Sequence, residues 1–182
     1  GYAYDIMGPT HHTVEDITIM RSIPNMKVHS PADSSTAAGL ALISYNDSSP
    51  QYIRFDRTGI PNLYSNKKVD FKNGMIKIKD GEDLCIIATG IMVHQALEVA
   101  SELKKEGIEA GVIDLHRIKP ITKDLLMDYI EGYPQIVTME EHLLAGGMGS
   151  AIAEIFVDEG ISTPLLRIGQ DDKFVFDLGG RQ

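Results

Sequence analysis

The sequence predicts a mixed α/β protein, in which the tail of one α/β domain precedes a complete three-layer domain with a mostly parallel sheet. Three observations predict this fold class. Residues 81–182 alternate apolar strand patterns with amphipathic helix patterns, which is typical of βαβ units. The first 65 residues carry only two clear strand patterns, too few for an independent sheet. The 182 residues are 43% apolar and 24% charged, as in ordinary globular proteins.

The N-terminal part opens with a turn-rich loop, Gly-Pro-Thr-His-His, at residues 8–12. Hydrophobic periodicity then predicts two helices and two strands, in chain order over residues 14–21, 26–29, 35–45 and 51–56. Thr13 is a candidate N-cap of the first helix, and Asp33 or Ser34 of the second. Because two strands form a poor sheet, we expect the chain to begin inside a domain whose other strands lie elsewhere.

The chain is expected to divide near residues 65–80. Residues 65–70 are polar and rich in lysine, which is typical of a linker. Residues 71–78 alternate around Asn73-Gly74, so we expect a β-hairpin that starts the next sheet. The predicted division is therefore residues 1–65, a linker and hairpin start at 66–80, and residues 81–182.

The C-terminal part repeats one rhythm of strand and helix. Strands are predicted over residues 84–89, 110–115, 135–140 and 165–168, and helices over 92–105, 123–129 and 151–158. Thr122 precedes the second of these helices as a candidate cap, and Gly107 and Gly160 end the first and third. Because the strands are apolar on both sides, helices are expected to cover both faces of the sheet.

Charge and cysteine content restrict the class of partner. Acidic residues outnumber basic ones by 26 to 17, which gives a net charge of −9 at pH 7. Such a surface repels polyanions, so we expect no nucleic-acid partner. No apolar run approaches the ~18 residues of a membrane span and no signal peptide is visible, so no membrane partner is expected. The single cysteine, Cys85, fits a reducing compartment, and we expect a cytoplasmic protein.

Two adjacent histidines are candidate functional residues. His11 and His12 lie in a strand-to-helix loop of the kind that lines ligand crevices in open α/β sheets. An imidazole there can exchange a proton near neutral pH or donate a hydrogen bond to an oxyanion. The alternative is that both histidines are surface or packing residues.

An arginine follows the second predicted strand of the N-terminal part. At that position the Arg57 guanidinium can bind a phosphate or carboxylate through two hydrogen bonds. The alternative is an ion pair with a neighbour such as Asp56 or Glu15. Arg54, on the same strand, has the same two interpretations.

A glycine-rich turn lies between a predicted strand and helix at residues 146–150, Gly-Gly-Met-Gly-Ser. It resembles a phosphate-binding turn, but the spacing of the dinucleotide motif and the P-loop lysine are missing. A tight turn with close helix packing is the favoured interpretation. The preceding Glu-Glu-His at residues 140–142 lacks a second ligand pair at metal spacing, so a structural or interface cluster is expected.

Taken together, these segments resemble the transketolase family. Residues 8–16 (GPTHHTVED) and 21–26 (RSIPNM) resemble a segment shared by transketolases and deoxyxylulose-phosphate synthases. Residues 57–61 (RTGIP) resemble the arginine segment that follows in transketolases. The segments that resemble the C-terminal domain of transketolases are residues 83–90, 114–120 (DLHRIKP) and 138–150 (TMEEHLLAGGMGS).

The resemblance implies a thiamine diphosphate-dependent transferase of carbohydrate metabolism, which moves a two-carbon ketol unit between sugar phosphates. It implies that residues 1–65 are the C-terminal part of a pyrimidine-binding domain and that residues 81–182 are a transketolase C-terminal domain. His11 matches the histidine that contacts the ketose near its reacting carbons, and is the candidate catalytic residue. His11, His12 and Arg57 are the candidate substrate-binding residues, with Arg57 on the phosphate. No cofactor-binding or metal-binding residue is assigned in this chain.

The chain also departs from the family pattern. Met7 stands where transketolases commonly have an aspartate before the Gly-Pro-Thr-His motif, and His12 replaces a glutamine. The glutamate that activates thiamine and the diphosphate-binding domain are absent from the 182 residues. We therefore expect thiamine diphosphate and Mg²⁺ to bind to the complete enzyme and not to this chain alone, which is expected to be inactive by itself.

Two kinds of partner protein follow from the resemblance, and three functions are weighed. The protein partner is either a second copy in a homodimer or a separate diphosphate-binding subunit. A transketolase-type transferase acting on sugar phosphates is the leading function. The alternatives are a related thiamine enzyme, either a deoxyxylulose-phosphate synthase or a 2-oxo acid dehydrogenase β subunit, and a non-catalytic dimerisation module.

Overall fold

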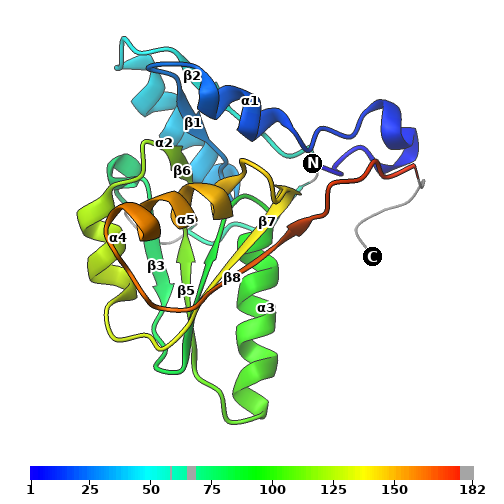
Figure 1. The fold of residues 1–182 in the computed structure, drawn as a ribbon. Coiled ribbons are helices and arrows are strands. Elements are labelled where there is room, and N and C mark those ends of the chain that lie inside the picture. Colours follow the sequence, from blue (N-terminus) through cyan, green and yellow to red (C-terminus); the bar gives the residue numbers. More distant parts are fainter. Residues whose placement is uncertain (58, 65–68, 177–182) are drawn as a thin grey trace.

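A computed structural model describes residues 1–57, 59–64 and 69–176 (Figure 1). Its larger sheet has five strands in the order β3-β5-β4-β7-β8. Their bounds are β3 Ile76–Lys79, β4 Leu84–Ala88, β5 Ala110–Asp114, β7 Ile136–Leu143 and β8 Leu165–Gln170. Strands β5, β4, β7 and β8 are parallel to one another, and β3 pairs antiparallel with β5. The predicted mostly parallel sheet is confirmed.

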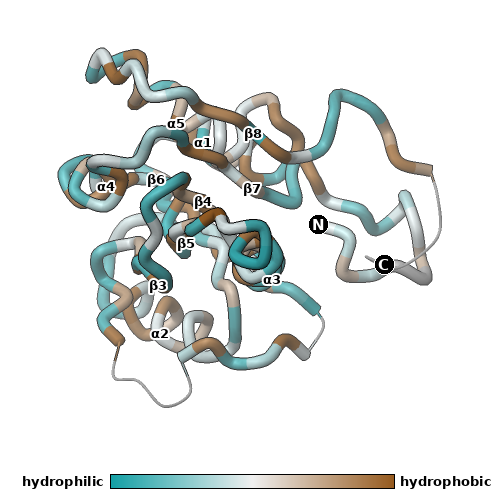
Figure 2. Tube along the Cα trace, turned by 90° about the horizontal axis from the view of Figure 1, so that it is seen from below, coloured by the Kyte–Doolittle hydropathy of each residue, from teal (hydrophilic) through white to brown (hydrophobic). Residues whose placement is uncertain are grey.

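Helices cover both faces of this sheet (Figure 2). Helices α4 (Lys123–Ile130) and α5 (Met148–Asp158) lie over one face and α3 (Met92–Lys105) over the other. Alternate residues of β4 enter two separate cores, Cys85 and Ile87 on the α4 and α5 side and Ile86 and Ala88 on the α3 side. The three-layer prediction is therefore confirmed, and two-sided burial accounts for strands that are apolar throughout.

A second sheet has the order β2-β1-β6. Strands β1 (Lys27–His29) and β2 (Gln51–Ile53) run parallel, and both were expected from the sequence. The third strand, β6 (Arg117–Lys119), comes from the C-terminal part and pairs antiparallel with β1. It was not predicted, because three residues before a proline give too little pattern to read as a strand. The C-terminal part therefore completes the sheet of the N-terminal part.

Helices α1 (Asp16–Ser22) and α2 (Ser34–Tyr45) begin in different ways. The Asp33 carboxylate accepts a hydrogen bond from the backbone N–H of Thr36 at 2.7 Å, so the predicted cap of α2 is confirmed. The predicted Thr13 cap of α1 is wrong, since that helix starts after Glu15 and has no side-chain cap from its own segment. A distant residue caps it instead, as described below.

The hairpin predicted at Asn73-Gly74 is also wrong. Residues Phe71–Asn73 form a 3₁₀ turn, η2, which Gly74 ends at φ 86°, a left-handed conformation suited to glycine. The Phe71 ring packs edge-on against Tyr64 and His116, and this contact holds the segment in a turn. Strand β3 then pairs with β5 and not with the preceding segment. Residues 65–68 of the predicted linker lie outside the described residues, and the predicted domain boundaries stay predictions.

Thr122 stands at the N-cap position of α4, but its hydroxyl does not cap the helix. It donates to the carbonyl of Asn73 at 2.8 Å and accepts from Arg117 Nη2 at 2.8 Å. The side chain therefore ties α4 to the η2 turn and to β6. Among the helices of the described residues, none is long and apolar enough to cross a membrane.

Candidate functional site

The Gly-Pro-Thr loop orients His11. Residues Asp5–Thr10 form a 3₁₀ segment, η1, in which Gly8 adopts φ 56° to turn the chain. The Thr10 hydroxyl donates to the carbonyl of Met7 at 2.9 Å, and His11 Nδ1 lies 2.8 Å from the same hydroxyl oxygen. Because the single hydroxyl proton is used on Met7, His11 Nδ1–H is the donor to Thr10. Nε2 of the neutral ring is then the nitrogen available to accept a proton.

One tyrosine ring contacts two of the predicted site residues. The Tyr4 and His11 ring centres lie 5.1 Å apart with their planes 79° apart. The guanidinium carbon of Arg57 lies 3.7 Å from the centre of the same Tyr4 ring, which is cation–π geometry. His11 and Arg57 are both exposed, and Tyr4 is partly buried. The structure therefore brings His11 and Arg57 together, although they lie far apart in the sequence.

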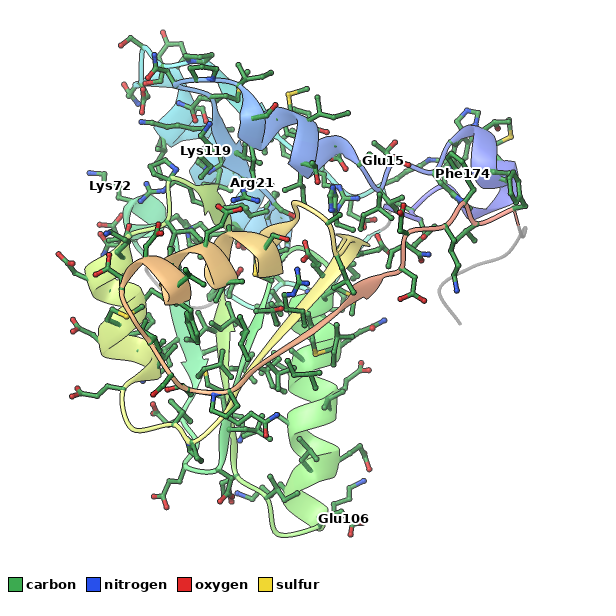
Figure 3. The ribbon with its side chains drawn as sticks, viewed as in Figure 1. Glu15, Arg21, Lys72, Glu106, Lys119 and Phe174 are labelled. Atoms are coloured by element: carbon green, nitrogen blue, oxygen red, sulfur yellow. The ribbon has the colours of Figure 1, made fainter. Side chains whose placement is uncertain are left out.

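His12 contacts the ring of Tyr2 and not that of Tyr4. Its imidazole packs edge-on against Tyr2 with the ring centres 4.7 Å apart. Both of its ring nitrogens are buried and have no hydrogen-bond partner among the described residues. The Tyr2 hydroxyl donates to Gln170 Oε1 at 2.9 Å, so His12 lies toward the segment that follows β8. Figure 3 labels Phe174 in the segment that follows β8.

Arg54 forms an ion pair and hydrogen bonds that link three segments of the chain. Its Nε lies 3.1 Å from Asp16 Oδ2, and both side chains are largely buried. Its Nη2 donates to the carbonyls of Thr13 at 2.6 Å and Glu141 at 3.1 Å. The Tyr52 hydroxyl donates to the same Asp16 oxygen at 2.8 Å. These bonds join the end of β2 to α1 and β7, so the ion-pair interpretation of Arg54 is confirmed.

The glycine-rich turn holds a carboxylate of the protein. Glu140 accepts hydrogen bonds from the backbone N–H groups of Met148 at 2.6 Å and Gly149 at 2.8 Å, at the start of α5. A Cβ on Gly147 would lie 2.2 Å from Glu140 Oε2. Burial raises the pKa of Glu140 to about 7, although both backbone hydrogen bonds act to lower it. The helix start is therefore filled, and the tight-turn interpretation of residues 146–150 is confirmed.

His142 is a helix cap that no local sequence pattern indicates. Its Nδ1 lies 2.8 Å from the carbonyl of Leu143, and its Nε2 lies 3.2 Å from the backbone nitrogen of Ile17 and 3.4 Å from that of Thr18. Nδ1–H therefore donates and Nε2 accepts, so the ring is neutral. Burial lowers the pKa of His142, which favours the same form. The expected structural role of the Glu-Glu-His segment is confirmed.

A buried polar cluster lies where the two parts of the chain meet. The fully buried Asp114 accepts a hydrogen bond from the Tyr64 hydroxyl at 2.8 Å, and burial raises its pKa to about 7. His116 donates from Nε2 to the carbonyl of Phe71 at 3.0 Å, and burial lowers its pKa to about 4. His29 of β1 is buried nearby, and burial lowers its pKa to about 4 as well. The sequence signal was two polar residues, Asp114 and His116, at the end of an apolar strand.

The described residues do not fit a diphosphate–Mg²⁺ site. The glycine-rich turn that could hold a phosphate is filled by Glu140. No group of three or more His, Cys, Asp or Glu side chains in the part that the structure describes is arranged to hold a metal ion. The Cys85 thiol is buried, which raises its pKa to about 12, so it is not a reactive thiolate.

The fold is that of an α/β protein whose mostly parallel sheet is preceded in the chain by a Gly-Pro-Thr-His loop. Family models agree in chain order: "Transketolase, pyrimidine binding domain" matches residues 1–62, and "Transketolase, C-terminal domain" matches residues 74–175. The chain belongs to the transketolase family, as the sequence resemblance indicated. The family implies thiamine diphosphate in the full enzyme.

Three curated relatives illustrate the range within the family. A "Putative transketolase C-terminal section" of Methanocaldococcus jannaschii is 38% identical over 92% of this chain and 52% of its own length. One subunit of an apulose-4-phosphate transketolase of Phocaeicola vulgatus is 31% identical over 94% and 55%. A "1-deoxy-D-xylulose-5-phosphate synthase" of Aquifex aeolicus is 34% identical over 92% and 27%. This chain therefore spans about half the length of the first two relatives and about a quarter of the third.

A solved structure agrees with these relatives. A "Split gene transketolase, inactive beta4 tetramer" is 38% identical to this chain and superposes with a TM-score of 0.85, over 91% of this chain and 55% of that one. A transketolase variant of Pichia stipitis is 22% identical with a TM-score of 0.74 over 96% of this chain and 25% of its own, and shows the shared fold alone.

Proposed function

We propose that this chain forms the C-terminal part of a transketolase-type enzyme, which transfers a two-carbon ketol unit between sugar phosphates with thiamine diphosphate. The observation that carries the proposal is the contact of both His11 and Arg57 with one tyrosine ring. The His11 imidazole, which can transfer a proton, and the Arg57 guanidinium, which can bind an anion, thereby lie close together at the surface. A sugar phosphate presents both a reacting carbonyl and an anionic phosphate to such a pair.

Each residue has a separate task in this proposal. Arg57 binds the phosphate of the sugar through two guanidinium N–H groups, which suits the geometry of that anion. His11 accepts a proton at Nε2 from a substrate hydroxyl near the reacting carbons, and the imidazolium formed in this way donates that proton to an alkoxide that develops there. The Nδ1–H bond to Thr10 sets the tautomer that this task requires. His12 is proposed to contact substrate from the adjacent position.

The cofactor is proposed to be held outside the described residues, since these do not fit a diphosphate–Mg²⁺ site. Thiamine diphosphate supplies the carbanion and electron sink for cleavage of the C–C bond when it is bound. The partner of this chain is proposed to be either a separate diphosphate-binding subunit or the corresponding domain of a second copy. The relative from Phocaeicola vulgatus, named as one subunit of its enzyme, and the split-gene structure support a separate chain. A cytoplasmic location belongs to the same proposal.

A related synthase is the second candidate function. Relatives at 34–37% identity are named 1-deoxy-D-xylulose-5-phosphate synthase, and the product in that name is also a sugar phosphate. Met7 precedes the Gly-Pro-Thr-His motif where transketolases commonly have an aspartate, and this departure from the transketolase pattern supports the second candidate. A 2-oxo acid dehydrogenase β subunit lacks comparable support among the named relatives described above. A non-catalytic dimerisation module remains the alternative from outside the enzymes.

A substrate comparison in the assembled enzyme tests the proposal. The chain is combined with its diphosphate-binding partner and the remainder of the pyrimidine domain, and supplied with thiamine diphosphate and Mg²⁺. Ketol transfer from a ketose phosphate to an aldose phosphate supports the transketolase. Condensation of pyruvate with a triose phosphate, in which the carboxylate of pyruvate leaves as CO2, supports the synthase. Neither reaction, with a stable dimer that binds no cofactor, supports the assembly module.

A further inference from the structure

One aromatic ring, that of Tyr4, contacts two of the three proposed substrate-binding residues. Arg57 lies over the face of Tyr4 at 3.7 Å, and the His11 ring centre lies 5.1 Å from that of Tyr4. The guanidinium and imidazole are therefore no farther apart than the sum of these two distances. Since one ring makes both contacts, a substitution of Tyr4 by an aliphatic residue removes both of them at once.

The chemistry of the contact suits a phosphate site. A guanidinium over an aromatic face keeps its N–H donors at its rim, where they can still bind a phosphate oxygen pair. The same contact restricts the rotamers of an otherwise exposed arginine, which lowers the entropy lost when an anion is bound. Tyr4 is partly buried and Arg57 exposed, so the ring is the better fixed of the two groups.

We propose that Tyr4 is a positioning residue, whose ring holds Arg57 and His11 at the separation of the phosphate and the reacting end of one sugar phosphate. This inference rests on the proposed function and deepens it. The neighbouring Tyr2 has a different task, since its hydroxyl is bonded to Gln170 and its ring contacts His12. The ring of Tyr4, and not its hydroxyl, carries the proposed effect.

The first test uses NMR on the 182-residue chain. Spectra of the Arg57 Nε–H and the His11 ring C–H signals are recorded for the wild type, Tyr4→Phe and Tyr4→Leu, with Tyr45→Leu as control because Tyr45 is 88% exposed. Loss of the ring current in Tyr4→Leu should shift both signals, whereas Tyr4→Phe and Tyr45→Leu should leave them near wild-type positions. Unchanged signals in Tyr4→Leu overturn the positioning role, whatever the activity.

The second test uses the assembled enzyme with a pentose phosphate acceptor and the same pentose without phosphate. Tyr4→Leu should raise KM for the phosphorylated acceptor by about two- to fivefold, the size of an exposed cation–π contact. Tyr4→Phe should restore KM. KM for the unphosphorylated acceptor should be unaffected, because that sugar has no phosphate for Arg57 to bind, whereas kcat should fall with both acceptors because Tyr4 also contacts His11. If Arg57→Ala raises KM for the phosphorylated acceptor and Tyr4→Leu does not, the positioning role of Tyr4 is overturned while the phosphate site at Arg57 stands. If neither variant changes it, the proposed phosphate site of Arg57 fails as well.

Discussion

Nε2 of His142 lies 3.2 Å from the backbone nitrogen of Ile17, so a side chain at the end of β7 caps a helix that lies 125 positions earlier. The other end of α1 is bonded to the C-terminal part as well, because Lys119 Nζ donates to the carbonyls of Arg21 and Ile23, each at 2.6 Å. Figure 3 labels Arg21 and Lys119, which lie where the two parts meet. Helix α1 is therefore held at both termini by residues of the other part.

Substitution of His142 should destabilise the protein without touching the proposed site. His142→Ala leaves the N–H groups of Ile17 and Thr18 without this acceptor, and we expect a loss of about 1–3 kcal/mol in the free energy of unfolding. Urea unfolding measures the loss, and hydrogen exchange at these two amides locates it. The exposed His11→Ala is the control and should change stability by less than about 0.5 kcal/mol. Equal stability of both variants would show that the cap contributes nothing.

Arg54 and Arg57 offer a matched pair of alanine variants three positions apart. Arg54→Ala leaves the largely buried Asp16 carboxylate without its ion-pair partner, so we expect destabilisation of about 3–5 kcal/mol. Arg57→Ala removes an exposed side chain and should change stability little, while lowering affinity for phosphorylated sugars in the assembled enzyme. Unfolding curves and KM values with phosphorylated and unphosphorylated sugars measure the two effects. An equal loss on both kinds of sugar would contradict a phosphate contact at Arg57.

His11→Ala should lower kcat of the assembled enzyme more than it raises KM. If Nε2 of His11 transfers a proton in the transition state, its removal is expected to cost about 100-fold in kcat or more. The measurement is steady-state kinetics across pH. His12→Ala is measured as the comparison variant, because the His12 ring contacts Tyr2 and not Tyr4. A kcat unchanged in His11→Ala would remove that histidine from the chemistry.

Asp114→Asn should make stability more sensitive to acid. His29 and His116 have pKa values lowered from 6.5 to about 4, so each favours unfolding as pH falls through that range. Asp114 and Glu140 have pKa values raised to about 7, so each favours the folded state over the same range. The two contributions oppose one another in the wild type. These four groups should therefore nearly cancel between about pH 4.5 and 6.5, so that the loss of stability on acidification comes mainly from His142, whose pKa is also lowered by burial.

The asparagine variant removes one proton-binding carboxyl from that balance. Its free energy of unfolding should therefore fall by up to ~1.4 kcal/mol per pH unit on acidification between about pH 6.5 and 4.5, relative to wild type. Asparagine can still accept from the Tyr64 hydroxyl, so the packing is conserved. Urea unfolding at three pH values measures the slope. Parallel pH profiles for variant and wild type would contradict the opposing contributions.

Local pattern was sufficient for most elements of the fold. The strands around Cys85 and Ile136 are apolar because helices cover both faces, and Asp33 caps α2 from within its own turn. The hairpin signal at Asn73-Gly74 failed because contacts of Phe71 with distant rings determine that segment. Likewise β6 forms only because β1 is available as a partner.

The candidate site was predictable only in part, for the same reason. His11 and Arg57 could be proposed from their loop and strand positions, but nothing in the sequence joins them. The ring that does so, Tyr4, carries no motif of its own, and its role depends on tertiary structure. The helix cap from His142 is similarly non-local, because its acceptor and its donors come from different parts of the chain.

Strand β6 also has an evolutionary consequence. Since Arg117–Lys119 pairs with β1 while lying between β5 and α4 in the chain, the smaller sheet is built from both parts. A gene fission between residues 64 and 76 would divide that sheet between two polypeptides, even though the polar sequence there is typical of a linker. We therefore expect viable breakpoints in this lineage to fall upstream of β1, so that the two parts are inherited as one unit.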